Sequence, residues 1–260
     1  MGILKVFNAL HAKKGENVLE RKIDINCDLG ESFGLYRYGA DQEVMPLISS
    51  ANVACGFHAG DPHVIRETVD LAVSCGVRIG AHIGFPDRLG FGRREIKVTP
   101  QEVYDYIIYQ LGALDGFLKI ANVTMSHIKL HGALYMMACE HKEISRETVR
   151  AVKEYNPKLE IYALPHSELA KQGKQEGLKV VNEFFADRPY DKKGVKMFDW
   201  SLEEIGSPAK VADNVLNVLE QDLVKGKQID TICVHGDTPN APSILSAIRE
   251  NLMEAGWCVG

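Results

Sequence analysis

Acidic, histidine and lysine side chains recur in short polar clusters along this chain of 260 residues. The clusters are Asn26-Cys27-Asp28-Leu29-Gly30-Glu31, Gly56-Phe57-His58-Ala59-Gly60-Asp61, Gly80-Ala81-His82, Lys129-Leu130-His131 and His235-Gly236-Asp237. Carboxylates and imidazoles transfer protons, and an ammonium group stabilises a developing negative oxygen. The clusters therefore indicate acid–base chemistry.

Lys129 is the residue that a purely structural role explains least well. It lies in a predicted strand between the apolar residues Ile128 and Leu130, where an ammonium is rarely buried without a negative partner. Asp28, Glu31 or a bound anion is the expected partner. A functional role is favoured over a structural one.

Other members of the clusters have simpler structural interpretations that stay open. His58 and His235 precede glycine-bearing turns, where an imidazole can serve only to bond loop backbone. Asp61 precedes a proline and is also a typical helix N-cap. Asp237 lies one residue before the cap expected at Thr238 and is harder to explain in this way.

Three side chains from separate predicted strands form a candidate metal site. Asp28, His82 and His131 offer one carboxylate and two imidazoles, a donor set that suits Zn²⁺ or a similar ion. The spacing His127-x-x-x-His131 offers no such site, because at ~3.3 Å per residue the two side chains lie ~13 Å apart on a strand. The sequence leaves open whether a metal is bound.

Two arginines and two glycine-rich loops are candidates for binding an anion. Arg93 and Arg94 follow Gly90-Phe91-Gly92 and suit a carboxylate or a phosphate, although a solvated basic turn is the alternative. The loops 56–62 and 236–239 lead into predicted helix starts, where backbone N–H groups favour negative charge. The chain has neither a P-loop motif nor a Gly-x-Ser-x-Gly nucleophile elbow.

Short strand-like runs alternate with helical patterns and must position these clusters. Helices are expected to start at Asp61-Pro62, Thr99-Pro100, Ser207-Pro208 and Thr238-Pro239, where a capping oxygen precedes a proline. This alternation predicts a parallel sheet with helical crossovers in one domain, residues 23–260, after an N-terminal extension of residues 1–22. The strand candidates are residues 23–29, 51–55, 77–83, 125–131, 159–164, 178–184 and 230–235.

The two faces of the predicted strands decide between an open sheet and a closed barrel. In 23–29, Ile23, Ile25, Cys27 and Leu29 alternate with polar residues, and 125–131 and 230–235 follow the same pattern. An open sheet covered on both sides would be apolar on both faces. One apolar and one polar face instead predicts an α/β barrel with a polar interior and chemistry at the carboxyl ends of its strands.

Charge and composition exclude several classes of partner and location. The 30 basic and 35 acidic side chains give a net charge of −5, so we expect no nucleic-acid partner. No apolar run approaches the ~20 residues of a membrane span, and we expect no secretion signal and no membrane partner. The six cysteines form no Cys-x-x-Cys pair, and free thiols indicate the reducing cytoplasm.

The chain resembles the LamB/YcsF family, which forms the A subunit of the ATP-dependent bacterial 5-oxoprolinase. The stretches that carry the resemblance run in the expected order from residue 23 to residue 240. They are Ile23 to Glu31, Ser50 to Pro62, Gly80-Ala81-His82, Gly90 to Arg94, Lys129 to Tyr135, Phe185-Ala186-Asp187-Arg188 and Asp230 to Pro239. The chain departs from the usual family pattern at Leu130, Met136, Ile83-Gly84 and residues 191–206.

The resemblance implies a distorted seven-stranded parallel (β/α) barrel related to the glycoside hydrolase/deacetylase barrels. It also implies opening of the 5-oxoproline lactam to L-glutamate, coupled to hydrolysis of ATP (with Mg²⁺), in a complex with subunits B and C. Phosphorylation of the lactam carbonyl oxygen would supply a better electrophile, which accounts for the use of ATP. Assembly with further copies of this chain stays open.

We hypothesise specific roles for the clustered residues in such a reaction. Asp28 acts as the base or as a metal ligand, and Lys129 and His131 stabilise the negative oxygen, with His58 and Asp61 in the same catalytic group. His82 orients water or completes the metal site. The remaining candidates, which bind substrate or anion, are Asn26, Glu31, Arg93, Arg94, His235 and Asp237. The alternatives are a metal-dependent deacetylase or amidohydrolase, and a small-molecule-binding subunit without catalytic activity.

Overall fold

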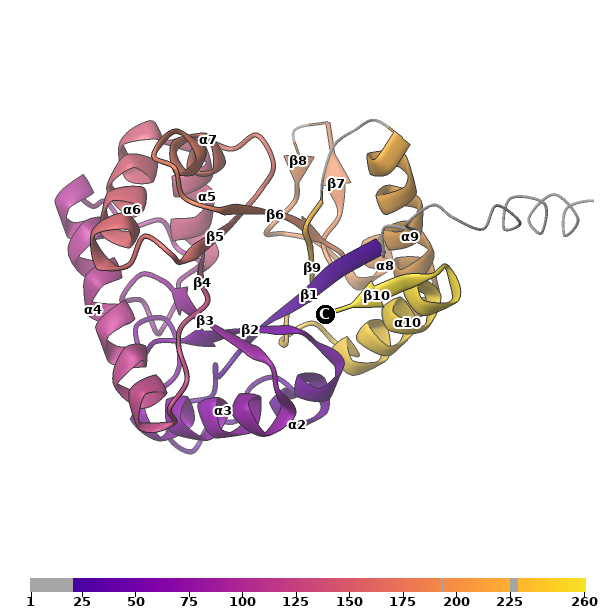
Figure 1. Cartoon of the computed structure of the whole chain (residues 1–260), viewed down its shortest axis with the longest axis horizontal. Helices are drawn as coiled ribbons and strands as arrows, with labels where there is room; N and C mark the ends of the chain where they lie inside the picture. Colours follow the sequence, from indigo (N-terminus) through magenta and orange to yellow (C-terminus); the bar gives the residue numbers. More distant parts are fainter. Residues whose placement is uncertain (1–20, 193, 225–228) are drawn as a thin grey trace, which may run out of the picture.

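Seven parallel strands close into a barrel in the computed structural model, which describes residues 21–192, 194–224 and 229–260 (Figure 1). The strands follow one another around the barrel in chain order, and the last pairs with the first. They are β1 (Arg21–Leu29), β2 (Ser50–Ala54), β3 (Arg78–Ile83), β4 (His127–Leu130), β5 (Glu160–Ala163), β6 (Val180–Phe185) and β9 (Thr231–Cys233). The predicted seven-stranded α/β barrel is confirmed.

The first strand has three neighbours, which makes the barrel irregular. Residues 21–23 of β1 pair with β10 (Trp257–Val259), residues 24–26 pair with β9, and residues 26–29 pair with β2. β1 thus begins at Arg21, within the expected N-terminal extension of residues 1–22. The first twenty residues of that extension lie outside the described residues.

Helices surround the barrel and cover its outer face (Figure 1). One face of the helix at residues 100–120 buries five aliphatic side chains at the ~3.6-residue spacing of a helix: Val103, Ile107, Leu111, Leu114 and Leu118. A short antiparallel pair, β7 (Tyr190–Asp191) and β8 (Gly194–Val195), follows β6. The helices are α2 (Asp41–Val44), the 3₁₀ helix η1 (Met45–Leu47), α3 (Pro62–Cys75), α4 (Pro100–Ile120), α5 (Gly132–Glu140), α6 (Lys142–Tyr155), α7 (Glu168–Gln175), α8 (Leu202–Ile205), α9 (Pro208–Val224) and α10 (Ala241–Glu254).

Three of the four predicted helix caps are confirmed, and one is wrong. The Ser207 hydroxyl accepts the backbone N–H of Lys210 (3.3 Å) at the start of α9. The Asp61 carboxylate accepts the first backbone N–H groups of α3, and Thr99 forms a capping box with Glu102 at the start of α4. α10 begins at Ala241 and not at Pro239, because Asn240 takes the left-handed conformation (φ 63°) just before it. The Thr238 hydroxyl donates to Asp187 Oδ2 (2.6 Å) and caps no helix.

The predicted division of the strands into an apolar and a polar face is confirmed. Ile25 and Cys27 of β1 are fully buried in the hydrophobic core. Asn26 and Asp28 bond across the barrel interior, where the Asn52 amide donates to both of their side chains at 2.8 Å. The interior is therefore filled by hydrogen-bonded polar side chains.

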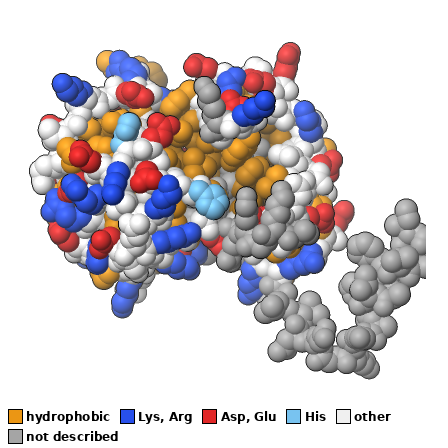
Figure 2. Space-filling model, turned by 90° about the horizontal axis from the view of Figure 1, so that it is seen from above, with side chains coloured by type: hydrophobic (Ala, Val, Ile, Leu, Met, Phe, Trp, Pro, Cys, Tyr) orange, Lys and Arg blue, Asp and Glu red, His pale blue; other side chains and the backbone are white. Residues whose placement is uncertain are grey.

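The surface mixes charges of both signs. Figure 2 shows one face of the molecule, on which hydrophobic side chains gather near the centre with acidic and basic side chains around them. No helix in the described ranges is both long enough and apolar enough to cross a membrane.

Candidate active site

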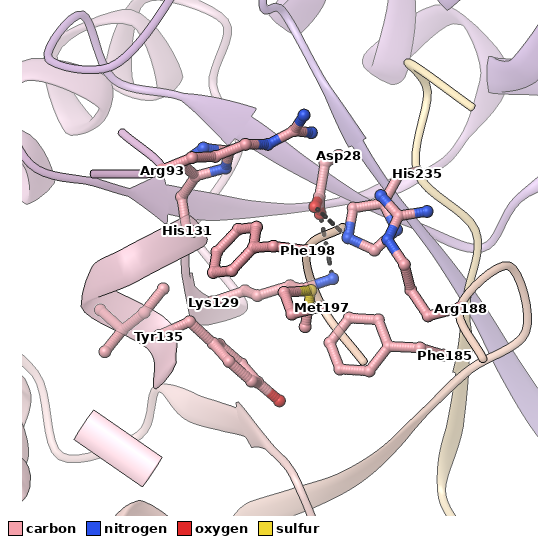
Figure 3. Close-up of a pocket in the computed structure, with 12 residues that line it drawn as sticks. Asp28, Arg93, Lys129, His131, Tyr135, Phe185, Arg188, Met197, Phe198 and His235 are labelled. Carbon is pink, nitrogen blue, oxygen red and sulfur yellow. Dashed lines mark ion pairs between the residues drawn. The ribbon is translucent and has the colours of Figure 1, made fainter. Parts of the chain in front are cut away.

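A buried ion pair between Asp28 and Lys129 lies inside the barrel (Figure 3). Lys129 Nζ is 3.1 Å from Asp28 Oδ1, and both side chains are at most 3% exposed. β1 and β4 position them, since the inward face of each parallel strand turns these residues toward the common interior. The expected pairing of Lys129 with Asp28 is thus confirmed, whereas Glu31 pairs with histidines instead.

Lys129 Nζ has further partners that hold it in place. Glu183 Oε1 lies 2.8 Å from Nζ, Cys233 Sγ 2.9 Å and Asn26 Oδ1 3.2 Å. The ammonium donates hydrogen bonds to Cys233 Sγ and Asn26 Oδ1 and forms ion pairs with Asp28 and Glu183. Lys129 therefore acts here as a fixed positive charge beside Asp28.

The surrounding charges keep this pair ionised. Burial works to raise the pKa of Asp28, but the neighbouring His82 and Lys129 outweigh burial and hold this pKa well below its usual value. Burial works to lower the pKa of Lys129, but Asp28, Cys233 and Glu183 hold it well above its usual value. The interior thus presents a carboxylate that is free of its proton at neutral pH.

A second carboxylate orients a histidine toward Asp28. His235 donates its backbone N–H to Asp187 Oδ2 (2.8 Å), and its Nδ1 lies 3.0 Å from Asp187 Oδ1. His235 Nε2 then faces Asp28 Oδ2 at 3.6 Å. Burial works to raise the pKa of Asp187, but His235 and Arg188 overcome it and lower this pKa. Asp187, His235 and Asp28 form a line along which a proton can move.

A small cavity lies beside these groups. Its volume is about 20 Å³, enough for one water molecule. Arg188 and Arg93 are both part of the cavity wall. The side chain of Arg188 is buried and that of Arg93 is 37% exposed, and both guanidinium groups face the Asp237 carboxylate. The wall also contains Asp28, Lys129, His131, Tyr135, Phe185, Met197, Phe198 and His235 (Figure 3). A water molecule in this cavity would lie next to a base and near two fixed cations.

Three histidines and Glu31 gather next to the cavity. The Glu31 Oε1 atom is 3.2 Å from His58 Nε2, 3.6 Å from His131 Nδ1 and 3.8 Å from His82 Nε2. Burial lowers the pKa of His58 and of His131 well below the usual value, and the neighbouring histidines lower both further. Burial and the charge of Asp28 raise the pKa of Glu31.

The structure brings Glu31 and His58 next to the two histidines of the expected metal site. Glu31, and not Asp28, groups with His58, His82 and His131, with all four ligand atoms within 4.8 Å of one another. Asp28 groups instead with Cys233 and His235. Asp28 Oδ2 still lies 3.3 Å from His82 Nε2, so the metal set expected from the sequence stays a prediction. Glu31 lies beyond the end of β1, where strand alternation gives no direction for a side chain.

Two candidate residues lie apart from this centre. Asp61 Oδ1 accepts the N–H groups of His63 and Val64, and its Oδ2 accepts that of Gly34 (2.7 Å), so its carboxylate serves as a helix cap. The side chain of Arg94 is 63% exposed and pairs with Asp87. These contacts correct the catalytic role expected for Asp61 and the anion-binding role expected for Arg94.

Three residues of the site are not among those predicted from the sequence. Glu183 lies on the inward face of β6, and Asp187 and Arg188 follow that strand. Glu183 stands between Asn182 and Phe184 and shares its strand face with the apolar residues Val181 and Phe185, so the apolar–polar alternation that marks Asp28 gives no signal for it. Asp187 and Arg188 lie in residues 185–188, one of the stretches that resemble the LamB/YcsF family. That resemblance by itself indicates no role for either side chain.

Comparison with known proteins agrees with this architecture. The LamB/YcsF family model matches residues 23–260. The A subunit of 5-oxoprolinase from Tolumonas auensis is 45% identical over 243 residues, which cover 90% of this chain and 97% of that protein. The crystal structure of a lactam utilization protein from Thermus thermophilus superimposes with a TM-score of 0.83 at 42% identity, over 92% of this chain and 98% of that one.

A more distant structure shares the fold alone. The catalytic domain of a peptidoglycan N-acetylglucosamine deacetylase from Eubacterium rectale has a TM-score of 0.51 at 10% identity, over 96% of this chain and 92% of that one. The expected relation to deacetylase barrels is confirmed at the level of the fold.

Proposed function

The chain belongs to the LamB/YcsF family, and we propose that it is the A subunit of a 5-oxoprolinase, which opens the lactam of 5-oxoproline to L-glutamate with hydrolysis of ATP. The observation that carries the proposal is the 3.1 Å pairing of Asp28 with Lys129 at the wall of a water-sized cavity. A lactam amide resists hydrolysis because its nitrogen donates electrons into the carbonyl. The reaction therefore needs an activated water and a stabilised oxyanion, which these groups can supply.

Asp28 is the proposed base. Its Oδ2 takes a proton from the water that attacks the carbonyl carbon, while Oδ1 is held by Lys129 and Asn52. The carbonyl oxygen gains negative charge near the fixed ammonium of Lys129, and preorganised donors of this kind contribute ~3–4 kcal/mol each. His235 Nε2, 3.6 Å from Asp28 Oδ2, passes the proton on to the ring nitrogen as the carbon–nitrogen bond breaks.

The two guanidiniums that face the cavity suit the carboxylate of 5-oxoproline. Arg188 and Arg93 come from different loops, and each already has an acidic partner that fixes its direction. Guanidinium groups bind carboxylates in a bidentate manner and remain charged at any relevant pH. The cavity of about 20 Å³ is smaller than the substrate, so Met197 and Phe198, which also line it, must move for binding.

We place ATP outside this cavity, on the partner subunits or between the subunits. Its γ-phosphoryl group passes to the lactam carbonyl oxygen with release of ADP, and after the ring opens a second water hydrolyses the resulting acyl phosphate to glutamate and inorganic phosphate. A volume of about 20 Å³ cannot hold a nucleotide, and the sequence contains no P-loop motif. Several relatives are named as the A subunit of 5-oxoprolinase, which supports partner subunits B and C for this chain. Location in the cytoplasm is part of the same proposal, since ATP is available there.

Turnover in the reconstituted complex tests the proposal. With subunits B and C, we expect formation of glutamate and of ADP that depends on both 5-oxoproline and this chain. Asp28→Asn should lower kcat by roughly 10²–10⁴-fold, whereas Asp105→Asn on the exposed face of α4 should leave it unchanged. Equal turnover in both variants would contradict the role of Asp28, and turnover without this chain would contradict the function.

The histidine cluster, which consists of His58, His82 and His131 beside Glu31, favours one second candidate function, a metal-dependent deacetylase or amidohydrolase. Glu31, His82 and His131 offer a donor set for a metal ion that could activate water. Hydrolysis of an acetamide or a simple amide by the isolated chain without ATP, abolished by a chelator, would support this candidate over the first. A third possibility, a binding subunit without catalytic activity, predicts that Asp28→Asn leaves turnover of the complex unchanged.

A further inference from the structure

Two imidazole nitrogens in the histidine cluster face each other in an arrangement that neutral histidines alone cannot satisfy. His131 Nε2 lies 2.7 Å from the backbone carbonyl of Phe91, and His82 Nδ1 lies 3.2 Å from that of Lys129. A carbonyl oxygen only accepts hydrogen bonds, so each of these nitrogens carries the ring proton. The remaining nitrogens, His131 Nδ1 and His82 Nε2, are then both acceptors, yet they lie 2.9 Å apart, and Asp28 Oδ2 lies 3.3 Å from the same His82 Nε2.

A carboxylate oxygen of Glu31 lies close to both of these acceptor nitrogens. Glu31 Oε1 lies 3.6 Å from His131 Nδ1 and 3.8 Å from His82 Nε2, and the three side chains are nearly fully buried. Donors bound at ~2.0–2.1 Å around one zinc ion are ~3.3 Å apart. The observed separations of 2.9–3.8 Å bracket that value.

We propose that Glu31 Oε1, His82 Nε2 and His131 Nδ1 bind one divalent transition-metal ion, such as Zn²⁺. Two imidazoles and one carboxylate suit such an ion better than Mg²⁺ or Ca²⁺, which prefer oxygen ligands. The two backbone carbonyls act as the outer partners that fix the tautomer of metal-binding histidines. The site goes beyond the proposed 5-oxoprolinase function and does not depend on it, and it gives the metal-dependent candidate function its ligands.

His58 belongs beside this site as a positioning residue. Its ring stacks on that of His131 with centroids 3.8 Å apart and planes 4° from parallel. One ion cannot lie in the planes of two stacked parallel rings, so His58 cannot share the ion with His131 in this arrangement. Its Nε2 lies 3.2 Å from Glu31 Oε1 and can hold the carboxylate in position.

The neighbouring group of Asp28, Cys233 and His235 does not offer a second metal site. Lys129 Nζ lies 3.1 Å from Asp28 Oδ1 and 2.9 Å from Cys233 Sγ, so an ammonium already occupies the place of a cation. A metal ion there would meet strong repulsion from Lys129. Asp28 Oδ2 lies 3.3 Å from the ligand atom His82 Nε2, while Lys129 holds its Oδ1, so we assign Asp28 a place beside the metal site and not among its ligands.

Metal binding by the purified full chain provides a test without substrate or partner subunits. After treatment with a chelator, we expect calorimetry to show one Zn²⁺ per chain, and Co²⁺ at the same site to give visible absorption bands of a nitrogen- and oxygen-ligated ion. Glu31→Gln, His82→Gln and His131→Gln should each weaken Zn²⁺ binding by more than about 100-fold. His58→Gln should weaken it by only about 10–100-fold, the range for outer-shell partners.

Two further variants serve as matched controls. Asp28→Asn and His235→Gln remove ligand atoms of the neighbouring group and should keep one Zn²⁺ per chain. Zn²⁺ should also raise the Tm of the native chain and of these controls, but not that of the three ligand variants, which separates loss of the site from loss of the fold.

Three results would overturn the proposed metal site. The first is that the native chain binds no Zn²⁺ even when Zn²⁺ is in roughly 100-fold excess over the chain. The second is that the Glu31, His82 and His131 variants bind Zn²⁺ as the native chain does. The third is that Asp28→Asn no longer binds Zn²⁺. In the first case a proton shared by the cluster, and no metal, holds His82 and His131 together.

Discussion

Lys129 Nζ and Asp28 Oδ1 form a 3.1 Å ion pair inside the barrel, although they come from the first and fourth strands of its wall. Glu183 approaches the same ammonium at 2.8 Å. One cation thus stabilises two buried carboxylates, and the three charges depend on one another. Removal of the cation should therefore affect stability as well as activity.

Lys129→Met should lower the free energy of unfolding by about 3–5 kcal/mol at pH 7, because it leaves buried carboxylates without a partner. The double variant Lys129→Met/Glu183→Gln should recover part of this loss, since it removes one of the unpaired charges. Urea unfolding measures both values. Lys153→Met, which breaks the exposed pair with Glu176, is the control and should change stability by less than about 0.5 kcal/mol. A similar small change for Lys129→Met would show that the buried carboxylates are protonated.

Asp187→Asn should lower kcat of the reconstituted complex by roughly 10²-fold and leave KM for 5-oxoproline nearly unchanged. The Asp187 carboxylate accepts the backbone N–H of His235 and lies beside its ring nitrogen Nδ1. Without this carboxylate the imidazole is no longer held with its Nε2 toward Asp28. Steady-state kinetics separates the two constants. A rise in KM without a change in kcat would instead assign Asp187 to substrate binding, through its neighbour Arg188.

Arg93 and Arg94 are adjacent in sequence but differ in surroundings, which gives a matched test of substrate binding. Arg93 lines the cavity, and Arg94 is directed to solvent beside Asp87. Arg93→Gln should raise KM for 5-oxoproline by about 10–100-fold, the value of one charged hydrogen bond of ~1.5–3 kcal/mol. Arg94→Gln should leave KM unchanged. The reverse result would restore the binding role expected for Arg94 from sequence.

The strand pattern of the sequence is sufficient to predict the barrel and its polar interior. Alternation in residues 23–29 and 125–131 determines which side chains face inward, so the pairing of Asp28 with Lys129 could be predicted. Alternation does not extend past the end of a strand. The directions of Glu31, Asp61 and Arg94 depend on loop geometry and helix caps, which explains why strand alternation could not place these side chains.

Asp61→Ala should destabilise the chain by about 0.5–2 kcal/mol, whereas Asp61→Ser should retain most of the stability, because serine also caps helices well. Both variants should keep the kcat of the native complex, since the carboxylate serves α3 and Gly34. Urea unfolding and steady-state turnover provide the two readouts. A loss of kcat in Asp61→Ser as large as that in Asp28→Asn would reinstate Asp61 as a catalytic residue.

His127 should make the stability of the fold depend on pH below about 6.5. Its ring is fully buried between Asn52, which lies 2.7 Å from Nε2, and Ser126, and it stacks on Tyr162. Burial, followed by the charges of Arg78 and Lys129, lowers the pKa of His127 well below its usual value. The folded chain therefore keeps this imidazole neutral at a pH where the unfolded chain binds a proton.

The sign of the effect follows from this difference in bound protons. The stability contributed by neutral His127 is complete above the unfolded pKa of ~6.5 and is lost as pH falls below it, with a slope of about 1.4 kcal/mol per pH unit. Urea unfolding between about pH 7.5 and pH 5 should show this loss in the native chain and a smaller slope in His127→Gln. The exposed control His63→Gln should keep the native slope. An identical slope in His127→Gln would mean that His127 is charged in the folded protein, which would bring a second cation into the interior beside Lys129.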